Sequence, residues 1–487
     1  MINIQKLLET LPCFNKYCSV NKINSLVDEL RGDSRFRIKV AGNGNSGIPI
    51  HHVRFNTGSI KVLVVAGPHA DEPIGSATVY SLLKLLNSNF HDLVSQDIEW
   101  NIVPCIDPDG AILNEGWSQK PFSFENFVRH SFKQNPADQA EFSFPLNYKK
   151  LAFNKQTPES KTLQNIIEET QPDYYFSLHN SIAGGAYFLI NKDVDSKYYP
   201  EIHKLAETYK IPLKKKVIQD QYGKGINTSI NSYPKVKDIY DHLSKSLDDP
   251  SKHLNWGNSS KDYLESIKKD AITFVAELSH VRHPSMSSDK ITDINLREMK
   301  LRVDAQNKYL FTVLIEEWDR VSEYLNVDSP FYRKMAPQIN YAKDYLHECF
   351  PEMQWLAARD LLFSPLYSGY ALEEDVFNTY MTDRYYAIAY SYSFVRLLKD
   401  SGHTAAVMDS IERLEALFDS ALTEIKNHID FSSFELIDIN DLVKMQLGSG
   451  MIILNAILEK KKPLIQWLCR NFDEYLFGIE ANHMSFK

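Results

Sequence analysis

Cysteine is scarce in this 487-residue chain, and the five cysteines show no regular spacing. Their odd number and scattered spacing argue against a disulfide framework and for a reducing compartment. Only Cys13 and Cys18 lie close together. Because no second Cys/His pair follows them at zinc-site spacing, we interpret them as isolated thiols and not as metal ligands. We therefore expect a cytoplasmic protein.

Long apolar runs and a basic surplus are absent as well. No apolar run approaches the ~20 residues of a membrane span. The N-terminal sequence MINIQKLLETLPCF lacks the basic and apolar regions of a signal peptide. Lysine and arginine number 54 against 63 aspartates and glutamates, which gives a net charge of -9. A nucleic-acid binder needs a basic face, so we expect neither a nucleic acid nor a membrane as a partner.

What is present is a globular composition with two distinct patterns along the chain. Hydrophobic residues make up 43% and charged residues 24%, as in globular proteins. Up to about residue 290, strand-like and helix-like segments alternate, which predicts an α/β fold with a largely parallel sheet. The predicted strands are Phe36–Ala41, Ile48–Phe55, Lys61–Gly67, Ile98–Ile106, Asp173–Asn180, Ala186–Ile190 and Ala271–Leu278.

Helical patterns dominate the rest of the chain. Pro73 and Pro158 open helices in the first part, the latter after the capping residue Thr157. After about Pro284, strand signals nearly vanish, so we divide the chain into an α/β domain, residues 1–290, and an all-α domain, residues 291–487. The predicted helices there are Asn295 to about Leu325, Pro330–Cys349, Leu372–Lys399, Thr404–Ile429 and Ile439–Lys461.

One predicted helical stretch, Thr379–Phe394, is dense in tyrosine. Tyrosines bury a large area while their hydroxyls reach hydrogen-bond partners. We interpret the stretch as a helix–helix interface, and the alternative is a surface that contacts substrate.

Four candidate catalytic side chains lie near the ends of predicted strands. His69 and Glu72 follow one strand in the sequence GPHADEPIG, and His179 lies in SLHN at the end of a second strand. Glu277 is close to the end of a third strand, Ala271–Leu278. Ligand sites in open α/β sheets lie at the carboxyl ends of strands. Two histidines and a glutamate form a zinc site that leaves a position for water. A further carboxylate can serve as the general base.

These segments resemble the zinc carboxypeptidase family, the relatives of pancreatic carboxypeptidases A and B. His69 and Glu72 match the family's H-x-x-E pair, and Ser177-Leu178-His179 matches its S-x-H element. The sequence from Ala271 to Leu278 resembles the strand that carries the catalytic glutamate, here Glu277. The resemblance covers roughly residues 20–285. It implies a three-layer α/β/α sandwich around a mixed, largely parallel sheet, and one zinc ion per chain.

The same resemblance gives candidate substrate residues. Asn147 occupies the place of the family's substrate-anchoring asparagine, and Ser260 lies in GNSSKDY, which is similar to its pocket loop. Tyr148 stands where the carboxylate-binding arginine is expected, and Pro145 where an aspartate orients a zinc histidine. Arg129 lies about where the family has the arginine that polarises the substrate carbonyl. A plain surface arginine is the alternative at that position.

Loss of the carboxylate-binding arginine weakens the case for an ordinary exopeptidase, because bidentate carboxylate recognition depends on it. The residues that could replace it are Lys149, Lys150 and Arg282. Two histidines follow Glu277 closely, His280 and His283. We interpret them as loop histidines with satisfied hydrogen bonds, and the alternative is that they line the mouth of the active site.

We therefore expect a zinc-dependent hydrolase that cleaves an amide bond in a small or modified peptide or an amino-acid conjugate. One alternative is an N-acyl amino acid deacylase of the aspartoacylase or succinylglutamate desuccinylase type. An alternative of another class is an inactive family member that acts as a binding or scaffold protein. The helical domain is expected to roof the active site, and homo-oligomerisation through that domain is a further option.

Overall fold

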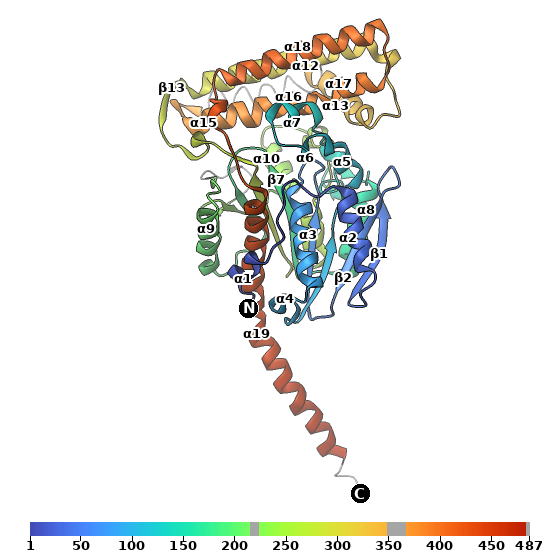
Figure 1. The fold of residues 1–487 in the computed structure, drawn as a ribbon, viewed down its shortest axis with the longest axis vertical. Helices are drawn as coiled ribbons and strands as arrows, with labels where there is room; N and C mark the ends of the chain where they lie inside the picture. Colours follow the sequence, from blue (N-terminus) through green and yellow to red (C-terminus); the bar gives the residue numbers. More distant parts are fainter. Residues whose placement is uncertain (215–223, 348–366, 484–487) are drawn as a thin grey trace.

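The chain forms an α/β part and a layer of helices stacked above it in the view of Figure 1. The computed structural model describes residues 1–214, 224–347 and 367–483. A last long helix, α19, descends from the helical layer along the α/β part and continues past it.

A nine-stranded mixed sheet organises the α/β part. Its central strands β4, β3, β7 and β11 run parallel, and antiparallel strands join on both sides. This confirms the predicted α/β class with a mixed, largely parallel sheet. In sheet order the strands are β1 (Phe36–Asn43), β2 (Pro49–Phe55), β4 (Ile98–Val103), β3 (Ile60–Ala66), β7 (Tyr174–Ser181), β11 (Ile272–Ser279), β8 (Tyr187–Ile190), β10 (Ile230–Asn231) and β9 (Gly225–Asn227).

Helices cover both faces of this sheet. On one face, α3 and α19 contact β7, and α9 packs against α19, while α8 lies on the other face against β1 and β2 with α11 beside it. The helices of this part are α1 (Ile4–Glu9), α2 (Val20–Leu30), α3 (Ile74–Asn87), α4 (His91–Val94), α5 (Pro108–Leu113), α6 (Glu115–Ser118), α7 (Phe124–His130), α8 (Pro158–Thr170), α9 (Tyr199–Thr208), α10 (Val236–Leu243) and α11 (Ser260–Ile267).

Strand alternation separates two apolar cores. Side chains of successive residues in a strand point to opposite faces. In β3, Val62 and Val64 belong to the core under α3, whereas Leu63 and Val65 belong to the core under α8. A strand that is buried on both faces explains the continuous apolar run in the sequence. The sandwich of three layers follows from it.

The helical layer consists mainly of long helices, as predicted, but one predicted helix is broken. The interpretation of Leu372–Lys399 as a single helix is wrong, because a π-helical segment, η7, and a turn at Tyr392 divide it. The elements of the layer are α12 (Leu296–Val321), α13 (Pro330–His347), α15 (Glu373–Asn378), η7 (Thr379–Arg384), α16 (Tyr385–Ser391), α17 (Ser393–Asp400) and α18 (Ala405–Lys426).

The last helix, α19 (Ile439–His483), follows the helical layer in the chain and packs on the α/β part. Its described side chains pack on α3, α9, β11 and β7. A single apolar cluster therefore runs from the sheet into the helical layer, and it includes Val62, Leu397 and Leu454. The predicted domain boundary at residue 290 stays a prediction, and α19, which lies beyond it in the chain, packs on the sheet.

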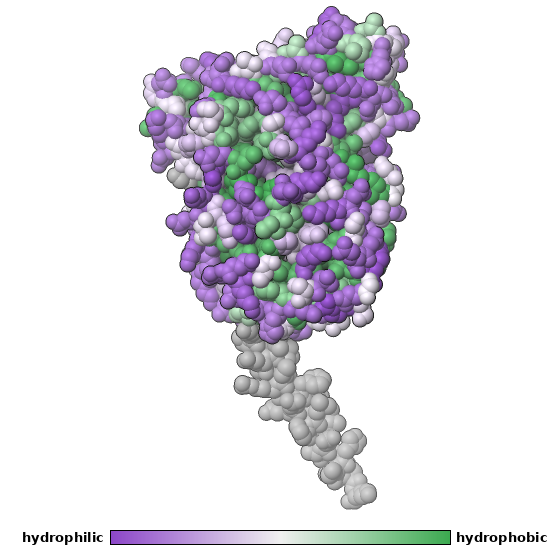
Figure 2. Space-filling model, viewed as in Figure 1, coloured by the Kyte–Doolittle hydropathy of each residue, from purple (hydrophilic) through white to green (hydrophobic). Residues whose placement is uncertain are grey.

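The same helix is the only described one whose length and composition would suffice to cross a membrane. In that stretch, Ile439–Lys461, 89% of the most apolar window is buried inside the protein. Such burial is typical of a core helix. Elsewhere on the face drawn in Figure 2, polar and apolar side chains alternate, and apolar ones are exposed along the junction between the helical layer and the α/β part.

Short strand pairs add further connections between distant segments. Beside the main sheet, β12 (Val281–Arg282) pairs with β15 (Glu435–Leu436), and β13 (Ile291–Asn295) pairs with β14 (Tyr370–Leu372). A third pair, β5 (Leu146–Tyr148) with β6 (Leu151–Phe153), forms a hairpin in the α/β part. The first two pairs hold the segment after β11 against the helical layer.

Candidate metal centre and active site

A sharp turn after β3 places His69 and Glu72 at the carboxyl end of the sheet. Gly67 has a φ of +67°, a left-handed conformation that glycine adopts without a steric penalty. Gly75 lets α3 lie close to β7, since a Cβ there would stand 3.0 Å from the Cβ of Leu178. The turn and the close helix together direct Glu72 toward the end of β7.

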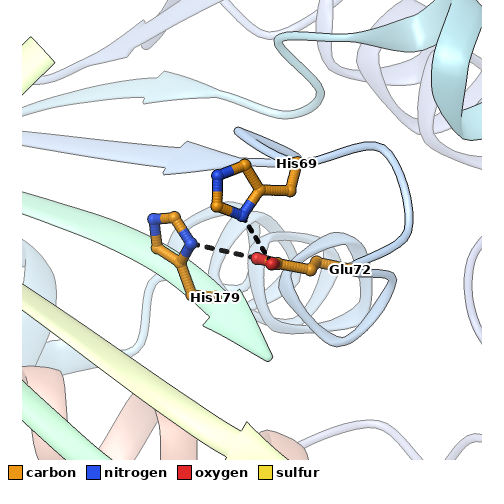
Figure 3. A group of neighbouring side chains, drawn as sticks. All are labelled: His69, Glu72 and His179. Carbon is orange, nitrogen blue, oxygen red and sulfur yellow. Dashed lines mark hydrogen bonds and ion pairs between the residues drawn. The ribbon is translucent and has the colours of Figure 1, made fainter. Parts of the chain in front are cut away.

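The third candidate ligand, His179, comes from β7 and meets the other two side chains (Figure 3). Its Nδ1 lies 3.0 Å from Oε2 of Glu72, and the Nδ1 of His69 lies 2.5 Å from Oε1 of the same carboxylate. One ligand atom from each residue lies within 4.8 Å of the others. The structure therefore brings His179 to His69 and Glu72, although it lies more than a hundred positions further along the chain.

This donor set fits a metal ion. Burial lowers the pKa of His69 to about 3, so its imidazole is neutral and can bind a cation. Burial alone would raise the pKa of Glu72, but His69, Lys133 and His179 outweigh it and lower that pKa, so the carboxylate stays charged. Two imidazoles and a carboxylate are a known zinc set with an open position.

The outer nitrogens of the two imidazoles are held differently. The Nε2 of His179 lies 2.9 Å from the hydroxyl oxygen of Ser177, within the S-x-H element. The Nε2 of His69 is buried and has no hydrogen-bond partner among the described residues. A metal-binding histidine usually donates this N–H to a carboxylate or carbonyl. This agrees with the sequence resemblance, in which Pro145 stands where the family has an aspartate that orients a zinc-binding histidine. Proline has no side-chain oxygen that could accept a hydrogen bond from that nitrogen.

A buried polar chain supports the centre from behind. The backbone N–H of Asn180 donates to Oε2 of Glu72 over 3.2 Å, and the Asn180 side chain contacts His280 at 2.8 Å. His280 in turn contacts the hydroxyl of Tyr17 at 2.6 Å, and burial lowers its pKa to about 3. His280 is therefore a buried structural residue with satisfied hydrogen bonds. It lies in the bend between β11 and β12, which agrees with the interpretation of a loop histidine with satisfied hydrogen bonds.

The helix α19 also reaches this region. The side-chain amide of Gln446 donates to the backbone carbonyl of His179 over 2.8 Å, and its oxygen accepts a hydrogen bond from Thr78. Gln446 is fully buried. A residue far along the chain thus fixes the backbone that carries a candidate ligand.

Glu277 lies beside the cluster. In the strand register it pairs with His179 of β7 on one side and with Tyr187 of β8 on the other. Residues paired in this way direct their side chains to the same face of a sheet. Burial, followed by the negative charge of Glu72, raises the pKa of Glu277 to about 8. Its carboxyl group is therefore suited to accept and return a proton near neutral pH.

The cluster also contains a cation that sequence reasoning missed. The ammonium of Lys133 lies 3.3 Å from Oε1 of Glu72 and 3.5 Å from Oδ1 of Asp71. Burial alone would favour the neutral amine, but these two carboxylates outweigh it and raise the pKa of Lys133. A charged donor therefore stands next to the candidate ligands. The sequence showed only a polar residue four positions after Arg129.

Two tyrosines of α16 approach the cluster from the helical layer. The Tyr390 hydroxyl donates to Oδ2 of Asp71 over 3.0 Å, and the Tyr386 hydroxyl accepts from the backbone N–H of Ile182 over 2.7 Å. Their rings stack with centroids 5.3 Å apart. They belong to the tyrosine-dense stretch Thr379–Phe394. Other tyrosines of that stretch pack between elements, as Tyr385 does against α7, so the stretch combines the interface with a contact to the candidate site.

Arg129, the expected carbonyl-polarising residue, contacts other groups. Its guanidinium donates to the hydroxyl of Tyr392 at 2.8 Å and to Asp419 at 3.2 Å, and its third partner is Glu415 at 3.8 Å. These partners belong to the helical layer. The structure therefore shows Arg129 as a half-exposed link to that layer, and the nearby cation of the cluster is Lys133.

Two of the three expected substrate residues, Tyr148 and Ser260, hydrogen-bond to groups outside the cluster. Asn147 is exposed on the β5–β6 hairpin. The hydroxyl of Tyr148 donates to Asp241 over 2.8 Å. Ser260 is fully buried, and its hydroxyl donates to Glu141 over 3.0 Å. The hydroxyl of Ser260 is thus engaged in a structural hydrogen bond, and its role in substrate binding stays a prediction.

The three cations considered as replacements for the missing arginine are also paired elsewhere. Their partners are carboxylates on the surface: Lys149 with Asp241, Lys150 with Asp249 and Arg282 with Glu435. None of these pairs involves a residue of the cluster. Lys133 is thus the cation that directly contacts a candidate metal ligand among the described residues.

Comparison with known proteins agrees with this site. The family model described as zinc carboxypeptidase matches residues 23–282, which is more than half of the chain and includes all three candidate ligands and Glu277. No curated protein matched.

Solved structures similar to the chain include carboxypeptidase A from Helicoverpa armigera, with 16% identity, 57% of this chain and 70% of that chain covered, and a TM-score of 0.35. Bovine thrombin-activatable fibrinolysis inhibitor has 12% identity, with 53% and 86% of the two chains covered and a TM-score of 0.33. The metallo-carboxypeptidase from Burkholderia cenocepacia has 14% identity, with 54% and 60% covered and a TM-score of 0.31. On the family match, this chain belongs to the zinc carboxypeptidase family.

Proposed function

We propose that the protein is a zinc-dependent hydrolase that cleaves an amide bond in a small or modified peptide or an amino-acid conjugate. The observation that carries the proposal is the convergence of two imidazole nitrogens and one carboxylate on a single point, with Glu277 alongside. One zinc ion per chain would be held by His69, Glu72 and His179. Such an ion supplies a Lewis acid and lowers the pKa of water.

The chain's own residues would move the proton. Glu277 accepts the proton of the attacking water and later returns it to the leaving amine. Its raised pKa means that the free carboxyl group holds a proton at neutral pH in the absence of a cation. A cation nearby favours the charged form of a carboxylate. Binding of a cation at the metal site would therefore favour the deprotonated form of Glu277, which is the form that accepts a proton from water.

Lys133 would stabilise the negative charge that develops on the substrate oxygen. It is a buried cation next to the candidate ligands, and Asp71 keeps it in place. A preorganised donor aimed at developing charge contributes strongly in a site from which water is excluded. Lys133 thereby takes the role that the family resemblance suggested for Arg129.

The helical layer supports a restriction to small substrates. Tyr386 contacts the backbone at Ile182, three residues after His179, and Tyr390 holds Asp71, one residue before Glu72. Both tyrosines thus cover the approach to the cluster from the side of the helical layer. A long peptide would have to displace them, whereas a small conjugate would fit beneath them.

The N-acyl amino acid deacylase alternative is favoured by one observation. Among the described residues of the β5–β6 hairpin, none supplies an unpaired cation in place of the missing arginine. Tyr148 bonds to Asp241, Lys149 pairs with the same carboxylate, and Lys150 pairs with Asp249. We also propose a cytoplasmic location, which the free thiols of Cys13, Cys18 and Cys105 support. No nucleic-acid or membrane partner is proposed.

The test compares wild-type protein with Glu277→Gln on a panel of N-acyl amino acids, dipeptides and longer peptides. Glu277→Gln keeps the size of the side chain but cannot take a proton. We expect it to retain zinc and to lower turnover at least ~10²-fold, the lower end of general acid–base contributions. Zinc analysis and initial rates measure both effects.

Glu29→Gln serves as the matched control, since Glu29 is an exposed carboxylate, and it should leave turnover unchanged. Equal turnover of Glu277→Gln and wild type would remove Glu277 as the base. Activity on long peptides alone would contradict the covered site, and zinc-free wild-type protein without turnover would identify an inactive binding protein.

A further inference from the structure

The helical layer contains a pocket of its own, away from the metal centre. It lies between α12, η7 and α18 and has a volume of about 450 Å³, within the range of small-molecule sites. Its lining combines charged, polar and apolar groups: Arg302, Gln306, Tyr309, Arg384, Leu417 and Glu424. A mixed lining of this kind is able to orient a ligand and also bury part of it.

One donor in this pocket is not satisfied. Arg384 is 4% exposed, and its guanidinium donates to Asn307 over 2.9 Å and lies 3.7 Å from a carboxylate oxygen of Glu424. Its Nε, however, is buried and has no hydrogen-bond partner among the described residues. A buried polar group without a partner costs free energy, so a native structure usually supplies one.

One acceptor in the same pocket is also unsatisfied. The amide nitrogen of Gln306 donates to Glu424, while its Oε1 is buried and has no partner among the described residues. The pocket thus offers one buried donor on a cation and one buried acceptor. A ligand that satisfies both needs a negatively charged acceptor and an N–H or O–H donor close together.

The charge of the lining points in the same direction. Arg302 and Arg384 face a single carboxylate, that of Glu424, which leaves an excess of one positive charge. Arg302 is exposed and also hydrogen-bonds the hydroxyl of Tyr380. One carboxylate on the ligand would balance the excess, and guanidinium groups are well matched to carboxylates.

The backbone at Arg384 adds a further indication. Arg384 ends η7, and π-helical turns inside α-helices are rare and frequent at functional sites. The next helix, α16, carries the tyrosines that contact the cluster, Tyr386 and Tyr390. The pocket and the roof of the candidate active site are therefore neighbours along one continuous helical segment.

We propose that this pocket binds a small amino-acid derivative through its carboxylate. The carboxylate accepts from Nε of Arg384 and from Arg302, and the neighbouring nitrogen of the ligand donates to Oε1 of Gln306. Leu417 and the ring of Tyr309 cover the remainder of the molecule. A free amino acid and an N-acyl amino acid share this chemistry, and the binding site is separate from the metal centre.

Binding is measured by calorimetry in the His179→Ala background, so that the metal centre does not contribute. The ligands are free amino acids, their N-acetyl derivatives, N-acetyl amino acid amides without a carboxylate, and inorganic phosphate. We expect at least one of the first two classes to bind and the matching amides to bind at least ~10-fold more weakly, the effect of losing a charged hydrogen bond. Which class binds identifies the source of the carboxylate.

Variants then place the bound molecule in the pocket. Arg302→Gln changes an exposed residue, so we expect the variant to keep the fold. It should weaken binding about tenfold, and Gln306→Met should do the same. Arg413→Gln is the matched control, because Arg413 is an exposed arginine of α18 that does not line the pocket, and its affinity should equal that of the parent. Four results would each overturn the proposal. In the ligand series they are no binding by any amino acid or N-acetyl derivative, binding of the amides with equal affinity, and tighter binding of phosphate. In the variants it is an unchanged affinity in Arg302→Gln. Because the metal centre is disabled throughout, the outcome is independent of whether the protein proves to be a hydrolase.

Discussion

Among single residues, the candidate metal ligands depend on one another for their charge. His69 is neutral because it is buried, whereas Glu72 keeps its charge because imidazoles and an ammonium surround it. Removing one member therefore removes a ligand and also changes the environment of the others. The core around them is large, so the fold does not rely on this site.

We expect His179→Ala to lose most of the bound zinc while the protein stays folded. The variant removes one of three ligand atoms, and the remaining pair cannot complete a tetrahedral site. Zinc content of the purified protein and its circular dichroism spectrum measure the two effects. His91→Ala is the control, since His91 is an exposed histidine. Wild-type zinc content in His179→Ala would rule out the three-ligand assignment.

Lys133 and Arg129 allow a direct comparison of two cations. Lys133→Met should keep zinc and lower turnover by about 10²–10³-fold, the effect of removing an oxyanion donor, and Lys133→Arg should recover part of it. Arg129→Met should change turnover little, because Arg129 contacts the helical layer. Initial rates at saturating substrate measure both. A larger loss of turnover in Arg129→Met than in Lys133→Met would instead assign stabilisation of the oxyanion to Arg129.

At the scale of elements, the sequence predicts well what depends on local pattern. His69, Glu72, His179 and Glu277 could be located because each stands near the end of a recognisable strand. The capping of α8 by Thr157 is likewise local, and its hydroxyl accepts from the backbone N–H of Ser160 as expected. These features need only periodicity, turn residues and motif order.

What depends on packing between distant elements could not be predicted. Lys133 reaches the centre from an irregular segment whose course no periodicity describes, and Tyr390 does so from a helix more than 300 residues beyond Asp71. Ser260 shows the opposite case. Its loop resembles a substrate pocket in sequence, but in the structure Ser259 caps α11, and the hydroxyl of Ser260 is buried and donates to Glu141.

The contact between α19 and β7 gives a prediction for an element. Gln446→Leu removes the hydrogen bonds to Thr78 and to the carbonyl of His179, and it leaves a buried carbonyl and a buried hydroxyl unpaired. Each unsatisfied buried group costs about 1–3 kcal/mol, so the free energy of unfolding should fall by ~2–6 kcal/mol. Urea unfolding measures it. Thr78→Val, which leaves Gln446 bound to the backbone, should cost less; equal losses would contradict the role of the backbone contact.

For the whole molecule, pH acts on stability through buried groups away from the active site. His52 on β2 is fully buried, and burial, together with the positive charge of Arg54, lowers its pKa to about 4. In the unfolded chain a histidine has a pKa of about 6.5. Between these values only the unfolded state binds the proton, so His52 stabilises the fold above pH ~6.5 and loses that contribution as the pH falls to 4.

The expected contribution is about 3 kcal/mol, from ~1.4 kcal/mol per pKa unit. His52→Gln cannot take up this proton, and its amide can still donate to Asn101. The free energy of unfolding of the variant should therefore fall less between pH 7 and pH 4 than that of the wild type. Other groups titrate equally in both proteins and cancel in the difference. Parallel pH curves for the two proteins would show that His52 does not titrate in this window.

The path of α19 has a consequence for the order in which the molecule is completed. Strand β11, which carries Glu277, ends at Ser279, and α19, which covers β7 and β11, begins at Ile439. The ribosome must therefore add another 439 − 279 = 160 residues before the sheet receives its covering helix. At about 5–20 residues per second this takes roughly 8–32 seconds. During that interval, one apolar face of the nascent sheet is not covered by α19. We therefore expect the nascent chain to need a chaperone more than the completed protein does.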